Sequence, residues 1–209
     1  MSESADRYEV TYEELYGSGT NGVITGGRKF YQVITAHTQS KSGSSGKLTD
    51  ADMYMSMLYA AAHDVAGYSW FCYFPILAEL SASMVGFDGE GYGNGNGLNG
   101  AEDGKSYYDT AKNANYLYEL IQGLLDGYTL QTRSDSKNKL VTTLSNESGR
   151  TATIYVNADT IQMSESITVT ASGTECYLVG LGVGTAEAPY QTVSGEKTLA
   201  PGQALICLS

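Results

Sequence analysis

The pattern of apolar and polar positions changes near Gly127. Before that residue, runs rich in β-branched and aromatic side chains at 29–37 and 68–75 predict two strands. Apolar side chains at helical spacing predict two helices, one between these strands and one in the stretch that ends at Gly127. A strand, a helix and a second strand in this order predict a βαβ unit with parallel strands.

Capping signals place the ends of both predicted helices. Thr49 and Asp52 form a Thr-x-x-Asp cap at the start of the first helix, and Gly67 is placed to end it. Ser106 and Asp109 form a similar cap at the start of the second helix. The aromatic run after the first helix lacks alternation, so we expect a strand that is covered on both of its faces.

After the boundary the chain is almost entirely strand-like. We expect strands at 128–133, 139–144, 151–157, 166–171, 175–181 and 204–208, with a weaker one at 190–193. Turn residues separate them, including a turn at 194–195, and a spacing of roughly 8–12 residues is typical of an antiparallel sandwich. The predicted fold class is α+β, with a partial (β/α) barrel segment of the pattern β-α-β-loop-α followed by an antiparallel β-sandwich.

Composition and charge narrow the classes of partner. The chain has 209 residues, of which 17% are charged, and its formal net charge is −11. Nucleic-acid phosphates and anionic membranes attract clustered Lys and Arg, so we expect neither as a partner. No apolar run approaches the ~18 residues that suggest a membrane-spanning helix. The first residues also lack the basic and apolar regions of a secretory signal.

Three cysteines, Cys72, Cys176 and Cys207, are too few for a disulfide framework. A bridge between Cys176 and Cys207 inside one sheet domain is one interpretation, and small buried apolar side chains are the other. None of the three belongs to a Cys-x-x-Cys motif, so a structural zinc site is not expected.

Two glycine-rich segments partly match ligand-binding motifs. Residues 17–22 fit GxGxxG, but the flanking residues do not suit the strand and helix that a dinucleotide site needs, which favours a turn. Residues 86–104 carry acidic and amide side chains that could bind Ca²⁺, yet their spacing departs from the calcium-loop pattern and favours a mobile surface loop. His63 is interpreted as a helix-face residue. We expect no metal and no cofactor.

Candidate binding residues gather at the C-terminal ends of the two predicted parallel strands. His37 and Gln39 follow the first strand, and Trp70, Tyr73 and Phe74 lie in or after the second. Ligands of parallel α/β folds bind at this end of the strands. Aromatic rings there can stack on the apolar face of a sugar while their polar edges bond its hydroxyl groups.

A longer pattern resembles a known family. The string YMSMLYAAAHDVAGYSWFCYF at 54–74 resembles the penultimate helix and last strand of (β/α)₈-barrel glycoside hydrolases, in the retaining clan that includes β-galactosidases and cellulase-like enzymes. The string YDTAKNAN at 108–115 is similar to the final helix of those barrels. Residues 177–204 look like the closing strands of the β-sandwich that commonly follows them.

The resemblance implies three parts. Residues 1–28 form an irregular N-terminal segment, residues 29–127 the last two βα units of a TIM-type barrel, and residues 128–209 a β-sandwich accessory domain. A whole barrel needs about 250 residues, so its earlier units are expected to be missing from this chain.

The resemblance also bears on catalysis. In this clan the catalytic carboxylates follow strands four and seven; strand four is missing here, and 37–39 offers no carboxylate. No catalytic pair is identified. Glu79 and Asp88 follow the second strand and are candidates to line the cleft, and the alternative is that they are solvated loop charges.

The expected function is that of a glycoside hydrolase-related protein, a C-terminal fragment that is inactive alone. Its expected partners are an oligo- or polysaccharide and the missing N-terminal barrel portion. The alternative is a non-catalytic carbohydrate-binding or cell-surface module, with glycan bound by the sandwich. The location is expected to be extracellular or cell-surface if the N-terminus is truncated, and cytoplasmic otherwise.

Overall fold

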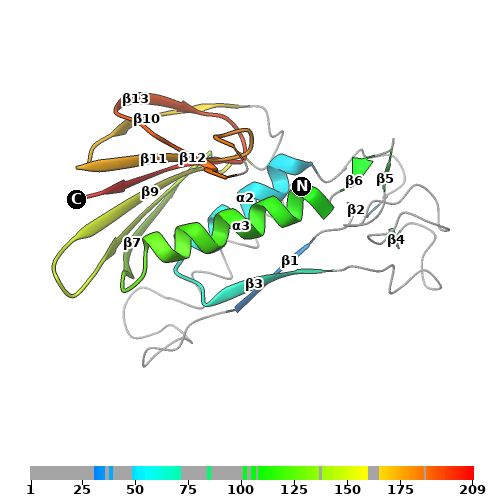
Figure 1. Ribbon diagram of the computed structural model, residues 1–209, viewed down its shortest axis with the longest axis horizontal. Helices are drawn as coiled ribbons and strands as arrows, with labels where there is room; N and C mark the ends of the chain where they lie inside the picture. The colour runs from blue at the N-terminus through cyan, green and yellow to red at the C-terminus, as the bar shows by residue number, and fades with distance from the viewer. Residues whose placement is uncertain are drawn as a thin grey trace.

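The structure is a computed structural model, and it places its secondary-structure elements in stacked layers (Figure 1). The described residues are 31–35, 38–39, 49–71, 84–85, 101–102, 105–106, 108–136, 138–159, 165–185 and 187–209. Two helices lie between a large antiparallel sheet on one side and a small parallel sheet on the other (Figure 1). No helix in these ranges is both long and apolar enough to cross a membrane.

The large sheet has six antiparallel strands in the order β12-β11-β14-β9-β8-β7. Its strands are β7 (Thr129–Ser136), β8 (Lys139–Ser145), β9 (Thr151–Asn157), β11 (Glu175–Gly180), β12 (Tyr190–Thr192) and β14 (Gln203–Leu208). Burial alternates along β8 and β9, as expected where successive side chains point to opposite faces. In β14 every residue from Ala204 to Leu208 is buried, because this strand is covered on both faces.

A second, smaller layer makes the sheet a sandwich. β10 (Ile167–Ala171) pairs antiparallel with β13 (Gly195–Leu199), and their Val169 and Leu199 pack on Leu205 and Cys207 of β14. The predicted α+β class and the antiparallel sandwich are therefore confirmed. β13 was not predicted, because only one residue in the stretch GEKTL is a large apolar one and a turn was expected at its start.

Helix α2 (Asp50–Ala62) is enclosed on all sides. Its capping box forms as predicted: the Thr49 hydroxyl accepts from the Asp52 amide at 3.2 Å, and the Asp52 carboxylate accepts from the Thr49 amide at 2.7 Å. Every residue from Met53 to Ala62 is buried. The helix contacts α3, the strands β8, β9, β11 and β14, and the small pair β1 and β3. It therefore joins the parallel strands to the sandwich through one core.

Two predicted helix ends are wrong. α2 ends at Ala62, and the chain reverses at Asp64, whose φ of 52° lies in the left-handed region that aspartate tolerates better than most residues. Gly67, expected to end the helix, instead begins β3 (Gly67–Phe71). Ser106, expected to cap the second helix, lies in the short strand β6.

Helix α3 (Tyr108–Leu124) packs beside α2. Its Ala114, Leu117 and Ile121 are buried in the shared core, in the stripe that the sequence predicts. Gly127 follows with a φ of 77°, a left-handed conformation that costs glycine little and that turns the chain into the sandwich.

The predicted βαβ unit is present. β1 (Tyr31–Thr35) pairs with β3 in parallel, with Tyr31 opposite Gly67, and α2 connects the two strands. Tyr31 lies over Gly67, where an added Cβ would come 2.7 Å from the tyrosine ring, and its hydroxyl donates to the Tyr68 carbonyl at 3.0 Å. The expectation that β3 is covered on both faces is wrong. On the face away from the helices, Ser69 of β3 is exposed and the neighbouring Tyr31 of β1 is 58% exposed.

Short strand pairs lie at one end of the parallel sheet. They are β2 (Thr38–Gln39) with β4 (Met84–Val85), and β5 (Ala101–Glu102) with β6 (Lys105–Ser106). Figure 1 shows β1 and β3 both pointing toward this end, so it is the C-terminal end of the parallel strands.

A disulfide between Cys176 of β11 and Cys207 of β14 lies between the sheet and the β10–β13 layer. The two cysteines are directly opposite in the strand register, with their Cα atoms 4.1 Å apart. Of the two interpretations that the sequence leaves open, the structure shows the bridge, and both side chains are also buried.

We expect reduction of this disulfide to destabilise the protein. Opening a bridge between residues 31 apart restores the entropy of a closed loop to the unfolded chain, which corresponds to about 3–4 kcal/mol. Urea unfolding with and without reductant measures the difference, in a protein carrying Cys72→Ser so that no third thiol can exchange. Identical unfolding midpoints under both conditions would show that the bridge does not form or does not contribute.

Candidate functional site

The structure places two of the residues that the sequence proposes for a site. Those outside the described residues are His37, Tyr73, Phe74, Glu79 and Asp88. Gln39 is in β2, where its backbone pairs with that of Met84, and Trp70 is in β3. Gln39 follows β1 in the chain, and Trp70 lies within β3, as the sequence predicts.

Trp70 is part of an aromatic cluster on the helix-facing side of β3. Its indole N–H donates to Oδ1 of Asn115 at 2.9 Å, and the hydroxyl of Tyr68 donates to the same atom at 2.6 Å. The rings of Tyr68 and Trp70 meet edge to face with centroids 5.2 Å apart, and Tyr68 makes a similar contact with Tyr118 at 4.7 Å. Trp70 remains half-buried, so its ring is fixed by the helix while part of it reaches solvent.

The phenol group of Tyr68 stays protonated. Burial, with smaller effects from Tyr118 and other neighbouring groups, raises the pKa of Tyr68 far above its ordinary value. The Tyr118 hydroxyl donates to the Val65 carbonyl at 3.1 Å, which ties α3 to the chain just before β3. The cluster is therefore a set of neutral donors held by one amide oxygen and one carbonyl.

His63 caps the C-terminal end of α2 and is fully buried. Its Nδ1 lies 2.8 Å from the Tyr59 carbonyl, and because a carbonyl only accepts, Nδ1 carries the proton. Burial lowers the pKa of His63 from 6.5 to about 3; the Tyr59 bond opposes this shift, and the charge of Arg133 adds to it. Arg133 pairs with Asp135 at 2.6 Å. His63 is thus a neutral core residue.

Metal binding finds no support in the part of the chain that the structure describes. Within those ranges, no three side chains of the His, Cys, Asp or Glu type gather closely enough to hold an ion.

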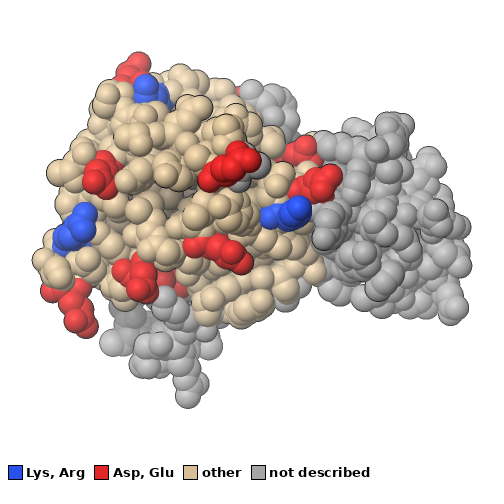
Figure 2. Space-filling model, viewed as in Figure 1, with Lys and Arg blue, Asp and Glu red and all other residues tan. Residues whose placement is uncertain are grey.

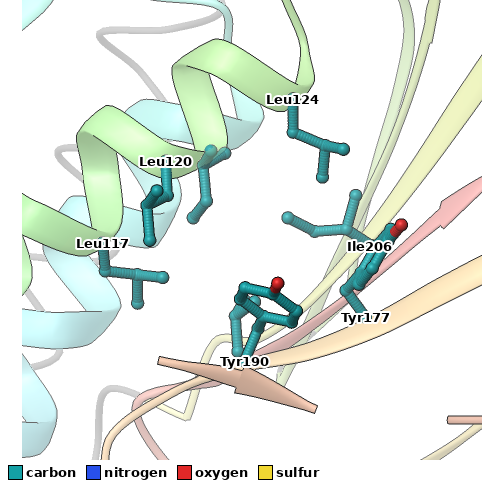
Figure 3. Close-up of a pocket in the computed structure, with 8 residues that line it drawn as sticks. Leu117, Leu120, Leu124, Tyr177, Tyr190 and Ile206 are labelled. Carbon is teal, nitrogen blue, oxygen red and sulfur yellow. The ribbon is translucent and has the colours of Figure 1, made fainter. Parts of the chain in front are cut away.

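A second candidate site is a groove between α3 and the large sheet, with a volume of about 250 Å³ (Figure 3). It is lined by Leu117, Leu120, Ile121, Leu124, Tyr177, Val179, Tyr190 and Ile206. Figure 3 shows the leucines of α3 on one side and Tyr177, Tyr190 and Ile206 on the other. The lining is aliphatic on the helix side and partly aromatic on the sheet side.

The two tyrosines of the groove form its polar edge. Their rings meet edge to face with centroids 5.7 Å apart. The Tyr177 hydroxyl donates to a carboxylate oxygen of Glu175 at 2.8 Å, and this bond is the main reason why the pKa of Tyr177 is raised. Tyr190 is 44% exposed and Leu120 is 36% exposed, so the groove opens to solvent through apolar side chains.

Sequence reasoning missed this groove. It placed Tyr177 and Tyr190 in strands without assigning them to a site, and it assigned Leu117 to the buried stripe of α3. The sequence did contain a sign of the groove, because Leu120 and Leu124 make the apolar stripe of α3 wider than its buried part.

The comparisons with known proteins do not assign this chain to a family. No protein-family model matches the sequence, and no curated protein matches it significantly.

Solved structures with some likeness include glycoside hydrolases. A family 27 β-L-arabinopyranosidase from Geobacillus stearothermophilus is 12% identical, with a TM-score of 0.48 over 99% of this chain and 41% of that one. A family 39 glycoside hydrolase from Bacteroides cellulosilyticus is 13% identical, with a TM-score of 0.45 over 98% of this chain and 37% of that one. An Anoxybacillus α-amylase is 11% identical, with a TM-score of 0.42 over 76% and 32% of the two chains.

This chain spans about two fifths or less of the length of those three proteins. Because every TM-score is below 0.5, the likeness assigns no residue and no activity.

We expect Asn115→Leu to destabilise the aromatic cluster. The substitution leaves the Tyr68 and Trp70 donors without their shared acceptor, and each lost bond corresponds to about 0.5–1.5 kcal/mol. Asn115→Asp is the matched control, because it keeps an acceptor oxygen at the same place. Urea unfolding gives the stability, and emission from Trp70, the only tryptophan, reports its surroundings. Equal stability of the two variants would contradict the role of Asn115.

We expect stability to fall as the pH falls from 6.5 toward 3. The unfolded chain takes up a proton at His63 near pH 6.5, whereas the folded protein resists it until about pH 3. The free energy of unfolding therefore declines by up to about 1.4 kcal/mol per pH unit in this window.

Urea unfolding between about pH 6.5 and about pH 5 isolates this effect, because most carboxylates titrate at lower pH. In His63→Gln the slope over this interval should become shallower, whatever the variant's absolute stability. An unchanged slope would mean that His63 is not the group responsible.

Proposed function

We propose that this chain is a glycoside hydrolase-related domain that binds carbohydrate and does not hydrolyse it by itself. The observation that carries the proposal is the position of Trp70, half-buried near the C-terminal end of a parallel strand pair and fixed by Asn115. A ring held in one orientation loses little entropy when a sugar stacks on it. His37, Gln39, Tyr73 and Phe74 remain the proposed neighbours of Trp70 in this site.

The arrangement around β1 and β3 supports an origin in a barrel. Both helices lie on one side of this parallel pair, and Tyr31 and Ser69 are exposed on the other side. In (β/α)₈ barrels the helices also cover one side of the strands, and the other side faces the barrel interior. We therefore propose that further βα units pair with the outer edges of β1 and β3 and close the sheet around the face that carries Tyr31 and Ser69, and that residues 29–127 and 128–209 correspond to the barrel and sandwich parts.

Hydrolysis also requires catalytic carboxylates at defined positions. A retaining glycosidase needs two carboxylates about 5–5.5 Å apart, one as nucleophile and one as acid and base. The sequence offers Glu79 and Asp88 after the second predicted strand, and they are not identified as such a pair. The proposal therefore assigns binding to this chain and assigns the chemistry to the further units.

Calorimetric titration with a panel of soluble oligosaccharides tests the proposal. We expect at least one to bind, and Trp70→Ala to weaken that binding about tenfold, or about 1.4 kcal/mol. Trp70→Phe keeps an aromatic ring and should weaken it less. Tyr190→Ser is the control, since it removes an exposed tyrosine that lies in the groove between α3 and the sheet.

Three results would contradict the proposal. Absence of binding across the panel would remove the carbohydrate function, and equal binding by Trp70→Ala would move the sugar to another surface, such as the sandwich. Release of the aryl group from aryl glycosides by the purified chain would show that it is an enzyme in its own right.

A further inference from the structure

The groove between α3 and the sheet is too small and too apolar for the carbohydrate site proposed above. Its volume of about 250 Å³ is below the roughly 300–1,000 Å³ of pockets that enclose a drug-sized ligand. Its lining consists of aliphatic side chains and two tyrosines, one of which already donates its hydroxyl hydrogen to Glu175. A space of this size and character suits one or two apolar side chains that anchor a larger partner.

Acidic residues lie close in the chain to the lining of this groove. Asp126 follows Leu124 by two residues, just after α3. On the sheet side, Glu175 accepts from the Tyr177 hydroxyl, and Glu187 stands three residues before Tyr190. All three carboxylates belong to exposed residues. We call Asp126, Glu175 and Glu187 the acidic rim.

The surface view agrees with this description. Figure 2 shows a largely uncharged area over α3 and the neighbouring strands, with acidic side chains around it and one basic side chain near the N-terminal part of α3. The sequence as a whole carries a formal net charge of −11. An approaching partner therefore meets negative potential before it meets the apolar lining.

We infer that the groove and its acidic rim dock a segment of another protein in which an aliphatic or aromatic side chain is flanked by Lys or Arg. The apolar side chain enters between Leu120 and Leu124 of α3 and Tyr190 of β12. The flanking cations lie against the rim, where opposite charges speed association and set the orientation.

The charge argues against two other occupants. A second copy of this chain would bring the same acidic rim to the contact and would be repelled by it. A neutral sugar would gain no attraction between opposite charges at the rim and would leave most of its hydroxyl groups against aliphatic side chains. A cationic peptide with an apolar anchor matches both the lining and the rim.

Fluorescence anisotropy with labelled peptides tests the inference on the whole chain. The probe is a peptide of alternating Lys and Leu, and its two comparison peptides alternate Lys with Ser and Glu with Leu. We expect the first to bind at least tenfold more tightly than either comparison peptide, because each of these lacks one of the two features. Raising the salt from about 0.1 M to about 1 M shortens the screening length from about 10 Å to about 3 Å and should weaken the binding.

Two matched pairs of variants locate the contact. Leu120→Ser should weaken binding about tenfold, whereas Tyr116→Ser, at an equally exposed residue of α3 outside the lining, should not. Asp126→Asn with Glu175→Gln should weaken it at least threefold. Glu147→Gln with Glu196→Gln changes the net charge by the same amount away from the rim and should have little effect.

The inference is overturned if the Glu–Leu peptide binds as tightly as the Lys–Leu peptide, or if Leu120→Ser and Tyr116→Ser bind alike. It is also overturned if sedimentation shows a dimer of this chain that Leu120→Ser dissociates, because the groove would then belong to a second copy. Trp70→Ala should leave peptide binding unchanged, so this inference and the proposed carbohydrate site can fail separately.

Discussion

The burial of α2 on every side is the constraint on which the rest of the structure depends. A helix at the surface of a protein has one apolar stripe and one polar face, but from Met53 to Ala62 this helix has no exposed residue. Such a helix is stable only when other elements surround it. The large sheet, α3 and the parallel pair β1–β3 each supply part of that cover, so the βαβ unit and the sandwich share one core instead of packing as separate bodies.

The same burial explains the chemistry at the end of this helix. His63 follows the last turn of α2 and is buried in the same core. Its ring lies next to the Tyr59 carbonyl and is close enough to Arg133 for that charge to lower its pKa. Burial disfavours a charged ring there, and the charge of Arg133 disfavours it further, which is why the pKa of His63 is low. The reversal at Asp64 and the bond from Tyr118 to Val65 then direct the chain into β3.

The two proposed sites differ because the helices pack differently on their two sides. On the side of the parallel strands, α3 supplies a single amide, Asn115, that fixes Tyr68 and Trp70 and leaves part of the tryptophan exposed. On the side of the sandwich, a groove remains between α3 and the sheet, and Leu120 and Tyr190 in its lining are exposed. The first arrangement offers a rigid aromatic ring, and the second offers an apolar recess within acidic surroundings.

The sequence alone determined the elements whose signals are local. The capping box at Thr49, the apolar stripe of α3, and most strands of the sandwich follow from neighbouring residues, and so does the parallel pairing of β1 with β3, because a crossover helix of this length permits it. The same reasoning placed Trp70 within its strand.

Only the tertiary structure decided the features that depend on distant residues. β13 is nearly all polar and becomes a strand because β10 and β14 offer it a partner and an apolar surface. The Cys176–Cys207 bridge needs the register of β11 on β14, and the groove needs Leu120 and Tyr190, which are 70 positions apart in the chain, to face each other. Periodicity reports which face of an element is apolar, but it does not report what will cover that face or leave it open.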